Sequence, residues 1–205
     1  MTQKNEPFLN VFRQYLTKLY QATHFDGQLI DLGPEVEKLA VELRKCWAEE
    51  RQVFICGNGG SAGNANHIAN DLIYPIAKKT WHGIRTHALS ANPATITCIA
   101  NDEGYKQIFS IQLMGMAQPG DVLIVLSGSG NSPNILEALA QAKRMSVKTF
   151  AILGFDGGKA KAKTDHPIHI PVQDMQIAED LQLVIAHMIV QWLAANNPFL
   201  NGDAQ

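Results

Sequence analysis

The sequence predicts a three-layer α/β/α fold built on a parallel sheet, with long helices at both ends of the chain. Apolar residues in 8–22 and in 34–50 recur at helical spacing before any strand pattern begins. Short apolar runs at 53–56 and 122–126 each lead into a segment rich in glycine and serine, as buried parallel strands do. From residue 53 onward, strand and helix patterns alternate, which indicates a parallel sheet with helices on both faces.

Each element rests on a local pattern. The helix at 34–50 opens with proline, which suits a first turn because proline lacks the backbone N–H that would stay unpaired there. The run at 122–126 is the clearest strand, and the one at 86–89 is weak. Ser132 before Pro133 predicts a helix start. The expected elements are helices at 8–22 and 34–50, a strand at 53–56, a helix at 61–73, a strand at 86–89, helices at 92–100 and 106–116, a strand at 121–126, a helix from 133 to about 145, strands at 148–153 and 168–172, and a helix at 175–196.

The composition predicts one domain over residues 1–205, with an N-terminal helical segment at about 8–50. The chain has 205 residues, 46% of them apolar, which suffices for a packed core. A net charge of −2 argues against nucleic acid as a direct partner. Its three cysteines form no CxxC pair and fit reduced thiols. No run reaches the ~18 unbroken apolar residues of a membrane span, so we expect a cytoplasmic protein with no membrane partner.

Two loops at the ends of predicted strands are candidates for binding a phosphate group. The first loop, residues 57–61, reads Gly-Asn-Gly-Gly-Ser, and the second loop, residues 127–132, reads Ser-Gly-Ser-Gly-Asn-Ser. Each opens a helix, whose N-terminal amides and partial positive charge favour an anion. The first loop has neither the spacing of a dinucleotide fingerprint nor that of a P-loop. Their lack of lysine and arginine favours a phosphate monoester held by neutral donors. The alternative interpretation is that these are ordinary turn residues and that Ser132 is only a helix cap.

Several separated motifs, in order, resemble the sugar isomerase (SIS) domain family. They are Cys56-Gly57-Asn58-Gly59-Gly60-Ser61 with His67 six residues on, Ala100-Asn101-Asp102, Gly120-Asp121-Val122-Leu123 leading into the second loop, and Gly154-Phe155-Asp156-Gly157-Gly158. The resemblance covers roughly residues 8–193 and is greatest to the phosphoheptose isomerases. These enzymes interconvert sedoheptulose 7-phosphate and D-glycero-D-manno-heptose 7-phosphate.

The resemblance implies a set of substrate contacts and an assembly. Four serines would bind the phosphate, Asn58 and Asp102 would contact the sugar, and Gly59 and Gly128 would lie against the ligand within the loops. The four serines are Ser61, Ser127, Ser129 and Ser132. The family also implies a homotetramer in which the terminal helices meet. The apolar stretch at 183–193 is compatible with such a contact, and equally with a helix buried inside one subunit.

The exchange of an aldose for a ketose requires a base, an acid and stabilisation of an enediolate. His67 and Asp71 stand four apart on one predicted helix, and Glu179 and His187 stand eight apart on another, so each pair shares a face. Two histidines with two carboxylates suit Zn²⁺ or a similar divalent ion, and the resemblance implies one such ion in each subunit. The alternative interpretation is a core histidine bonded to a carbonyl and a solvated pair at 67 and 71.

The chain departs from the phosphoheptose isomerase pattern at two positions. The family generally carries glutamate, which serves as the base, where this chain has Asp71, and glutamine where it has Glu179. Aspartate is one methylene shorter, and misplacing a base by about 1 Å can cost on the order of 100-fold in rate. Either Asp71 or Glu179 could therefore be the base, with His187 as its partner. Related regulators that bind the replication initiator lose the first carboxylate, whereas this chain keeps one.

Three hypotheses follow from these patterns. The first is a phosphoheptose isomerase. The second is a non-catalytic sugar-phosphate-binding regulator or scaffold with the same loops. The third is another sugar-phosphate isomerase or lyase on the same fold, since function resides in the site and not in the fold.

Overall fold

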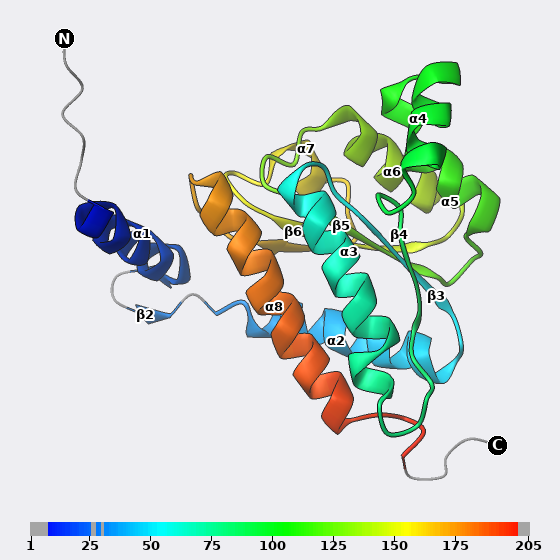
Figure 1. Cartoon of the computed structure of the whole chain (residues 1–205), viewed down its shortest axis with the longest axis horizontal. Helices are drawn as coiled ribbons and strands as arrows, with labels where there is room; N and C mark the ends of the chain where they lie inside the picture. The colour runs from blue at the N-terminus through cyan, green and yellow to red at the C-terminus, as the bar shows by residue number, and fades with distance from the viewer. Residues whose placement is uncertain (1–7, 26–27, 30, 201–205) are drawn as a thin grey trace.

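The computed structural model describes residues 8–25, 28–29 and 31–200. At its centre is a sheet of five parallel strands in the order β4-β3-β5-β6-β7, with helices on both faces (Figure 1). This confirms the predicted three-layer α/β/α fold. The strands are β3 (Gln52–Cys56), β4 (Arg85–Ala88), β5 (Val122–Ser127), β6 (Lys148–Leu153) and β7 (His166–His169).

The two faces of the sheet are covered by different helices. One face packs against α2 (Gly33–Ala48), α3 (Gly60–Ile73) and α8 (Met175–Ala195). The other packs against α5 (Ser110–Met116), α6 (Pro133–Arg144) and α7 (Gly158–Lys161), with α4 (Pro93–Asp102) at its margin. The short 3₁₀ turns η1 (Pro75–Ala77) and η2 (Tyr105–Gln107) follow α3 and α4.

Alternation along the strands divides the core into two halves. Successive side chains of a strand point to opposite faces, so Val53 and Ile55 join the half beneath α2, α3 and α8, while Phe54 and Cys56 join the other. All four are fully buried. Continuous apolar runs are therefore what a sheet covered on both sides requires, which explains why β3 and β5 could be predicted.

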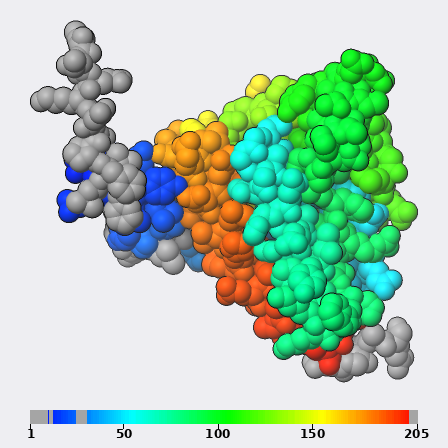
Figure 2. All heavy atoms as spheres, viewed as in Figure 1, coloured from blue at the N-terminus to red at the C-terminus, as the bar shows by residue number. Residues whose placement is uncertain are grey.

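The long helices predicted at the two ends of the chain lie next to each other. The first helix, α1 (Phe8–Thr23), lies beside the start of α8 (Figures 1 and 2). Lys18 Nζ contacts Asp174 Oδ2 at 2.7 Å and holds the pKa of that carboxyl below its usual range. Tyr15 donates a hydrogen bond to Asp180, which raises the pKa of the phenol to about 12. Two polar contacts thus anchor α1 to α8.

Two predicted elements differ from the structure, and one pair of short strands was not predicted. The last strand was predicted at 168–172 but spans His166–His169, because Pro167 is tolerated on this edge strand. The helix predicted at 106–116 is divided into η2 and α5, because the Ser110 hydroxyl bonds the Gln107 carbonyl and side chain just where α5 begins. The two-residue strands β1 (His24–Phe25) and β2 (Gln28–Leu29) had no counterpart in the prediction.

Helix α8 is long and apolar enough, by length and composition, to cross a membrane. Eight of its residues are nevertheless buried in this structure: Ile177, Ala178, Leu181, Gln182, Ile185, Ala186, Ile189 and Leu193. The seven apolar ones pack into the core beside α2 and α3. A core helix of a folded domain satisfies the same compositional test, and α8 has that role here.

Candidate functional site

Both predicted phosphate loops begin at the point where the strand order of the sheet reverses, between β3 and β5. Strands β3 and β5 are adjacent, with Cys56 opposite Val125. From β3 the chain continues to β4 on one side, and from β5 it continues to β6 and β7 on the other. Ligands of open parallel sheets bind at such a switch point, beyond the carboxyl ends of the strands. The first loop follows β3 and the second loop includes the end of β5, so the topology brings their starting points together.

The first loop is held to α6 by a pair of amides. Asn58 Nδ2 donates to Asn134 Oδ1 at 2.9 Å, and Asn134 Nδ2 donates back to Asn58 Oδ1 at 2.8 Å. The Tyr105 hydroxyl also donates to Asn58 Oδ1, at 3.3 Å. Gly57 is needed because a Cβ there would lie 2.6 Å from the Ser61 carbonyl oxygen. Asn58 is therefore fixed in orientation at the switch point.

The second loop presents hydroxyl groups that can still donate hydrogen bonds. Ser127 Oγ accepts from the Gly130 N–H at 3.0 Å, and Ser129 Oγ accepts from the Asn131 N–H at 3.3 Å. Because each oxygen is an acceptor in these contacts, its own hydrogen stays available to a ligand. Ser132 precedes α6 and makes no capping hydrogen bond through its side chain. Three hydroxyls at the N-terminus of a 12-residue helix form a suitable anion site.

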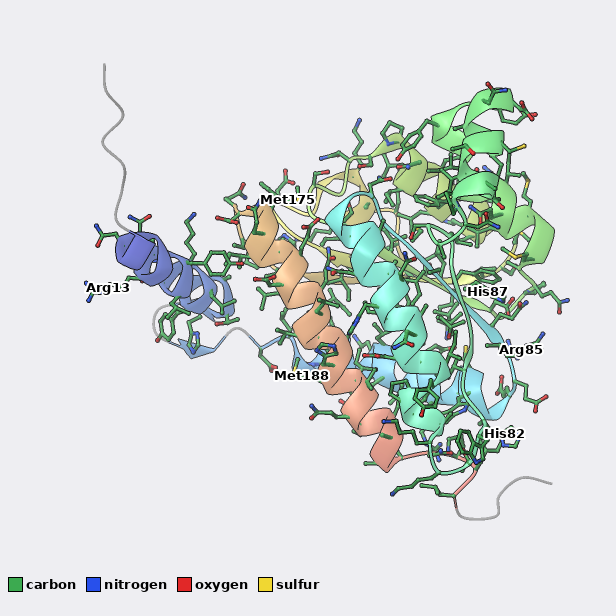
Figure 3. All side chains as sticks on the ribbon, viewed as in Figure 1. Arg13, His82, Arg85, His87, Met175 and Met188 are labelled. Atoms are coloured by element: carbon green, nitrogen blue, oxygen red, sulfur yellow. The ribbon has the colours of Figure 1, made fainter. Side chains whose placement is uncertain are left out.

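Glycines allow the second loop to pack closely against its neighbours. Gly130 has φ 63°, and a Cβ there would lie 2.1 Å from the Gly157 carbonyl oxygen. A Cβ on Gly128 would lie 2.4 Å from the sulfur of Met175, which begins α8 (Figure 3). Residue 128 thus lies directly against the end of the Met175 side chain, which would have to move to accommodate a larger residue there.

Three of the four predicted metal ligands lie together between α3 and α8. His67 Nε2 and His187 Nε2 are 2.9 Å apart, and Asp71 Oδ2 is 3.4 Å from the first and 3.6 Å from the second. The two helices run side by side, which brings His187 to the pair on α3 (Figure 2). The Asp71 side chain is 13% exposed, whereas the histidine side chains are 48% and 47% exposed. The cluster therefore has a buried carboxylate and an open, imidazole-lined side.

The donor set of this cluster fits a divalent metal. All three ligand atoms lie within 4.8 Å of one another. Ligands of a tetrahedral zinc ion are separated by about 3.3 Å, given Zn–N distances near 2.05 Å, and the observed separations are close to this value. Asn70 Nδ2 donates to Asp71 Oδ1 at 3.1 Å, which leaves Oδ2 for the cluster. Two imidazoles and one carboxylate with an open fourth position are typical of a catalytic site.

Comparison with known proteins places these features in a family. A model of the SIS domain matches residues 30–154, more than half of the chain. The chain belongs to the SIS domain family. A phosphoheptose isomerase of Nitratiruptor sp. is 34% identical over 177 residues, which cover 81% of this chain and 94% of that protein. One from Fusobacterium nucleatum is 36% identical over 157 residues, covering 77% and 80%.

Solved structures agree with these relatives. A phosphoheptose isomerase from Francisella tularensis superimposes with a TM-score of 0.82 and 26% identity, covering 94% of this chain and all of that one. The relatives and this structure place the SIS domain in the phosphoheptose isomerase branch, as its sequence motifs predicted.

In this SIS domain, Glu179 lies apart from the cluster of His67, Asp71 and His187. Its Oε1 accepts a hydrogen bond from the Ser61 N–H at 3.1 Å, at the start of α3. Glu179 and His187 share a face of α8, but eight residues of helix separate their backbones by about 12 Å. The predicted grouping of four ligands thus resolves into a cluster of three, with Glu179 at the first loop.

Asp102, the other predicted sugar contact, ends α4 and is exposed. Its Oδ1 accepts from the Asn101 side chain at 2.8 Å. Tyr105, three residues later, reaches Asn58, so the segment that follows Asp102 borders the first loop.

Sequence reasoning missed three buried or half-buried polar residues that support the site. Gln182 on α8 is 1% exposed and donates to Ser61 Oγ at 3.2 Å. Asn64 donates to Gln182 Oε1 at 3.0 Å, and Asn134 holds Asn58. A signal for Gln182 was present, because it is a polar residue within an apolar helical run, three residues after Glu179.

Proposed function

We propose that this chain is a phosphoheptose isomerase that interconverts sedoheptulose 7-phosphate and D-glycero-D-manno-heptose 7-phosphate. The observation that carries the proposal is the cluster of His67, Asp71 and His187, on the helix that follows the first loop and on the helix packed against it. The relatives named phosphoheptose isomerase support the same reaction.

The substrate's phosphate is held by the second loop. Ser127, Ser129 and Ser132 donate through their hydroxyls, and the N-terminus of α6 contributes its partial positive charge. Asn58, with Gly59 beside it, and Asp102 contact the sugar hydroxyls. Ser61 is the fourth predicted phosphate contact, and in the structure its polar groups are engaged by Glu179 and Gln182.

The proton transfers are assigned to the cluster. Asp71 removes a proton from C1 of the ketose and returns it to C2, while His187 delivers a proton to O2 and accepts the one from O1. The intermediate is an enediolate. The position of Glu179 at the first loop supports Asp71 as the base. Asn70 orients the Asp71 carboxylate for this role.

A divalent metal, with zinc the best match, would be held by His67, Asp71 and His187. When bound, it polarises the substrate oxygens as a Lewis acid. Metal and proton transfer would share the same side chains, so the level of metal loading would determine which residues are free to act on protons.

We also propose that the enzyme is a cytoplasmic homotetramer. One face of α8 exposes apolar side chains one turn apart: Val184, Met188 and Trp192 at 47%, 51% and 37% exposure. They border an apolar hollow of about 610 Å³ between α2 and α8. A second copy of the chain covering this face would remove that surface from water.

The test is turnover followed by ¹H NMR. The purified protein, with and without added Zn²⁺, is incubated with sedoheptulose 7-phosphate, and we expect the anomeric signal of the aldose to appear. Binding of the ketose with no aldose under either condition would contradict the proposal and favour a sugar-phosphate-binding regulator. If the protein turned over a different phosphosugar and not sedoheptulose 7-phosphate, that sugar would be assigned as its substrate.

A further inference from the structure

A carboxylate of the protein already occupies the first loop. Glu179 Oε1 accepts the Ser61 N–H at 3.1 Å and lies 3.5 Å from the Ser61 hydroxyl. A Cβ on Gly60 would lie 2.2 Å from Glu179 Oε2, so the carboxylate covers Gly60 as well. The N-terminus of α3 is where an anion is most favoured, and α8 supplies one from within the chain.

The remaining polar contacts of Ser61 are also made within the protein. Gln182 Nε2 donates to Ser61 Oγ at 3.2 Å. Asn64 Nδ2 donates to both Gln182 Oε1, at 3.0 Å, and the Glu179 carbonyl, at 2.9 Å. Ser61 is 4% exposed and Gln182 is 1% exposed. Among the residues described, these contacts form a closed network that leaves little of Ser61 open to a ligand.

The second loop, in contrast to Ser61 in the first, has serine side chains that are open to a ligand. Its Ser129 and Ser132 are only half-buried, and within the part of the chain that the structure describes neither hydroxyl donates a hydrogen bond to another residue. The two loops start from adjacent strands, yet only the second offers free donors without a carboxylate among them.

We propose that Glu179 is a resident anion that occupies the N-terminus of α3 in place of the substrate's phosphate, so that the second loop alone is the phosphate site. The inference rests on the proposed function, since it concerns where that substrate's phosphate is held. On this proposal, Glu179 determines which of the two loops binds the phosphate group. A carboxylate placed here repels a nearby phosphate and blocks the donors of Ser61.

The test compares phosphate affinity in variants of residue 179. Glu179→Ala removes both the charge and the blocking group, and we expect inorganic phosphate and sedoheptulose 7-phosphate to bind roughly tenfold more tightly by calorimetry. Glu179→Gln keeps the shape and an oxygen for the Ser61 N–H, so we expect a smaller gain of about threefold. The unphosphorylated sugar sedoheptulose should bind all these proteins equally, because it carries no charge to be repelled.

Two further variants localise the effect. Asp180→Ala removes the same charge from the next position of α8, where the carboxylate accepts from Tyr15, and should leave phosphate affinity unchanged. Adding Ser61→Ala to Glu179→Ala should reduce the gain, because the hydroxyl is a donor that the carboxylate had blocked. An undiminished gain in that double variant would overturn the proposal.

The remaining outcomes are equally decisive. Unchanged or weaker phosphate binding in Glu179→Ala overturns the proposal, as does loss of bound Zn²⁺ from that variant, which would make Glu179 a ligand. If Glu179→Ala fails to fold, Glu179→Gln decides by the same criterion. Binding of inorganic phosphate needs no turnover, so this experiment can succeed where the isomerase assay fails, and the reverse.

Discussion

At the scale of single residues, the carboxylate of Asp71 determines what the site can do. It lies 3.4 and 3.6 Å from two imidazole nitrogens and is held in place by Asn70. The two Nε2 atoms of His67 and His187 are 2.9 Å apart, a hydrogen-bond distance at which one nitrogen donates and the other accepts, depending on the tautomers. A carboxylate next to such a pair is well placed both to accept a proton and to balance the charge of a cation.

Asp71 gives the first prediction. Asp71→Asn keeps the shape and removes the base, so we expect kcat for sedoheptulose 7-phosphate to fall by about 100-fold or more, with little change in KM. Asp71→Glu restores a carboxylate and should retain measurable turnover. Steady-state kinetics of both variants with the same metal content make the comparison, and full activity in Asp71→Asn would remove this residue from the mechanism.

The second prediction concerns Ser132, in the second loop. Ser132→Ala removes a hydroxyl that makes no capping bond, so the free energy of unfolding should hardly change. We expect KM to rise by about tenfold, the cost of one hydrogen bond to a charged group, while kcat changes less. Thr17→Ala, an exposed hydroxyl on α1, serves as the control. An unchanged KM would show that the phosphate lies elsewhere.

At the scale of elements, an ion-pair network fastens the segment beside the first loop to α6. Glu137 on α6 contacts Lys106 Nζ at 2.9 Å and Arg144 Nη2 at 3.1 Å. The Lys106 ammonium, followed by the Arg144 guanidinium, holds the pKa of the Glu137 carboxyl below its ordinary value of 4.5. Because Tyr105 neighbours Lys106 and reaches Asn58, the network also steadies the sugar end of the site.

The lowered pKa of Glu137 predicts how the stability of the protein depends on pH. The folded-state pKa of Glu137 lies below the unfolded one, so its contribution to stability is present above about pH 4.5 and is lost as the pH falls through the folded-state value. We expect Glu137→Gln to lower Tm by roughly 3 °C at pH 7 and by less at pH 3. Thermal unfolding at both pH values is the measurement. Glu35→Gln, which breaks a looser pair with Lys38 at 3.8 Å, should have a smaller effect, and an equal loss at both pH values would contradict the assignment.

What could be predicted from sequence differs between the elements and the site. The strand at 122–126 could be predicted because a strand buried on both faces needs an unbroken apolar run, whereas the edge strand containing Pro167 lacks that constraint and was misplaced. The pairing of His67 with Asp71 follows from helical spacing alone. The approach of His187 depends on how α8 packs against α3, which no local pattern specifies. That Glu179 and His187 share a helical face was weak evidence that Glu179 joins the cluster, because residues on one face can be two turns apart.

At the scale of the whole molecule, the apolar face of α8 should join copies of the chain. Met188 lies in the middle of this face and is 51% exposed (Figure 3). Met188→Glu would place a charge in the proposed contact, so we expect the proposed tetramer to dissociate into smaller species while each subunit stays folded. Sedimentation velocity with circular dichroism tests both points. Glu103→Lys, an exposed charge change just past α4, is the control, and a tetramer that survives Met188→Glu would place the contact on another face.

The prediction of one domain over residues 1–205 can be tested on the same samples. The two halves of the core share the central strands, so unfolding of one half exposes the sheet of the other. We therefore expect a single cooperative transition in urea, with fluorescence and circular dichroism changing together. Separate transitions for the two signals would indicate two folding units.

A crystal structure of the Zn²⁺-loaded protein with sedoheptulose 7-phosphate, recorded with anomalous data at the zinc edge, would locate the phosphate, the metal and the reacting carbons in one experiment. We expect the phosphate within hydrogen-bond distance of Ser129 and Ser132, and a zinc peak between His67, Asp71 and His187. The sugar's C1 and C2 should lie next to Asp71. Phosphate bound away from the second loop, or a sugar whose reacting carbons do not reach Asp71, would contradict the proposed site.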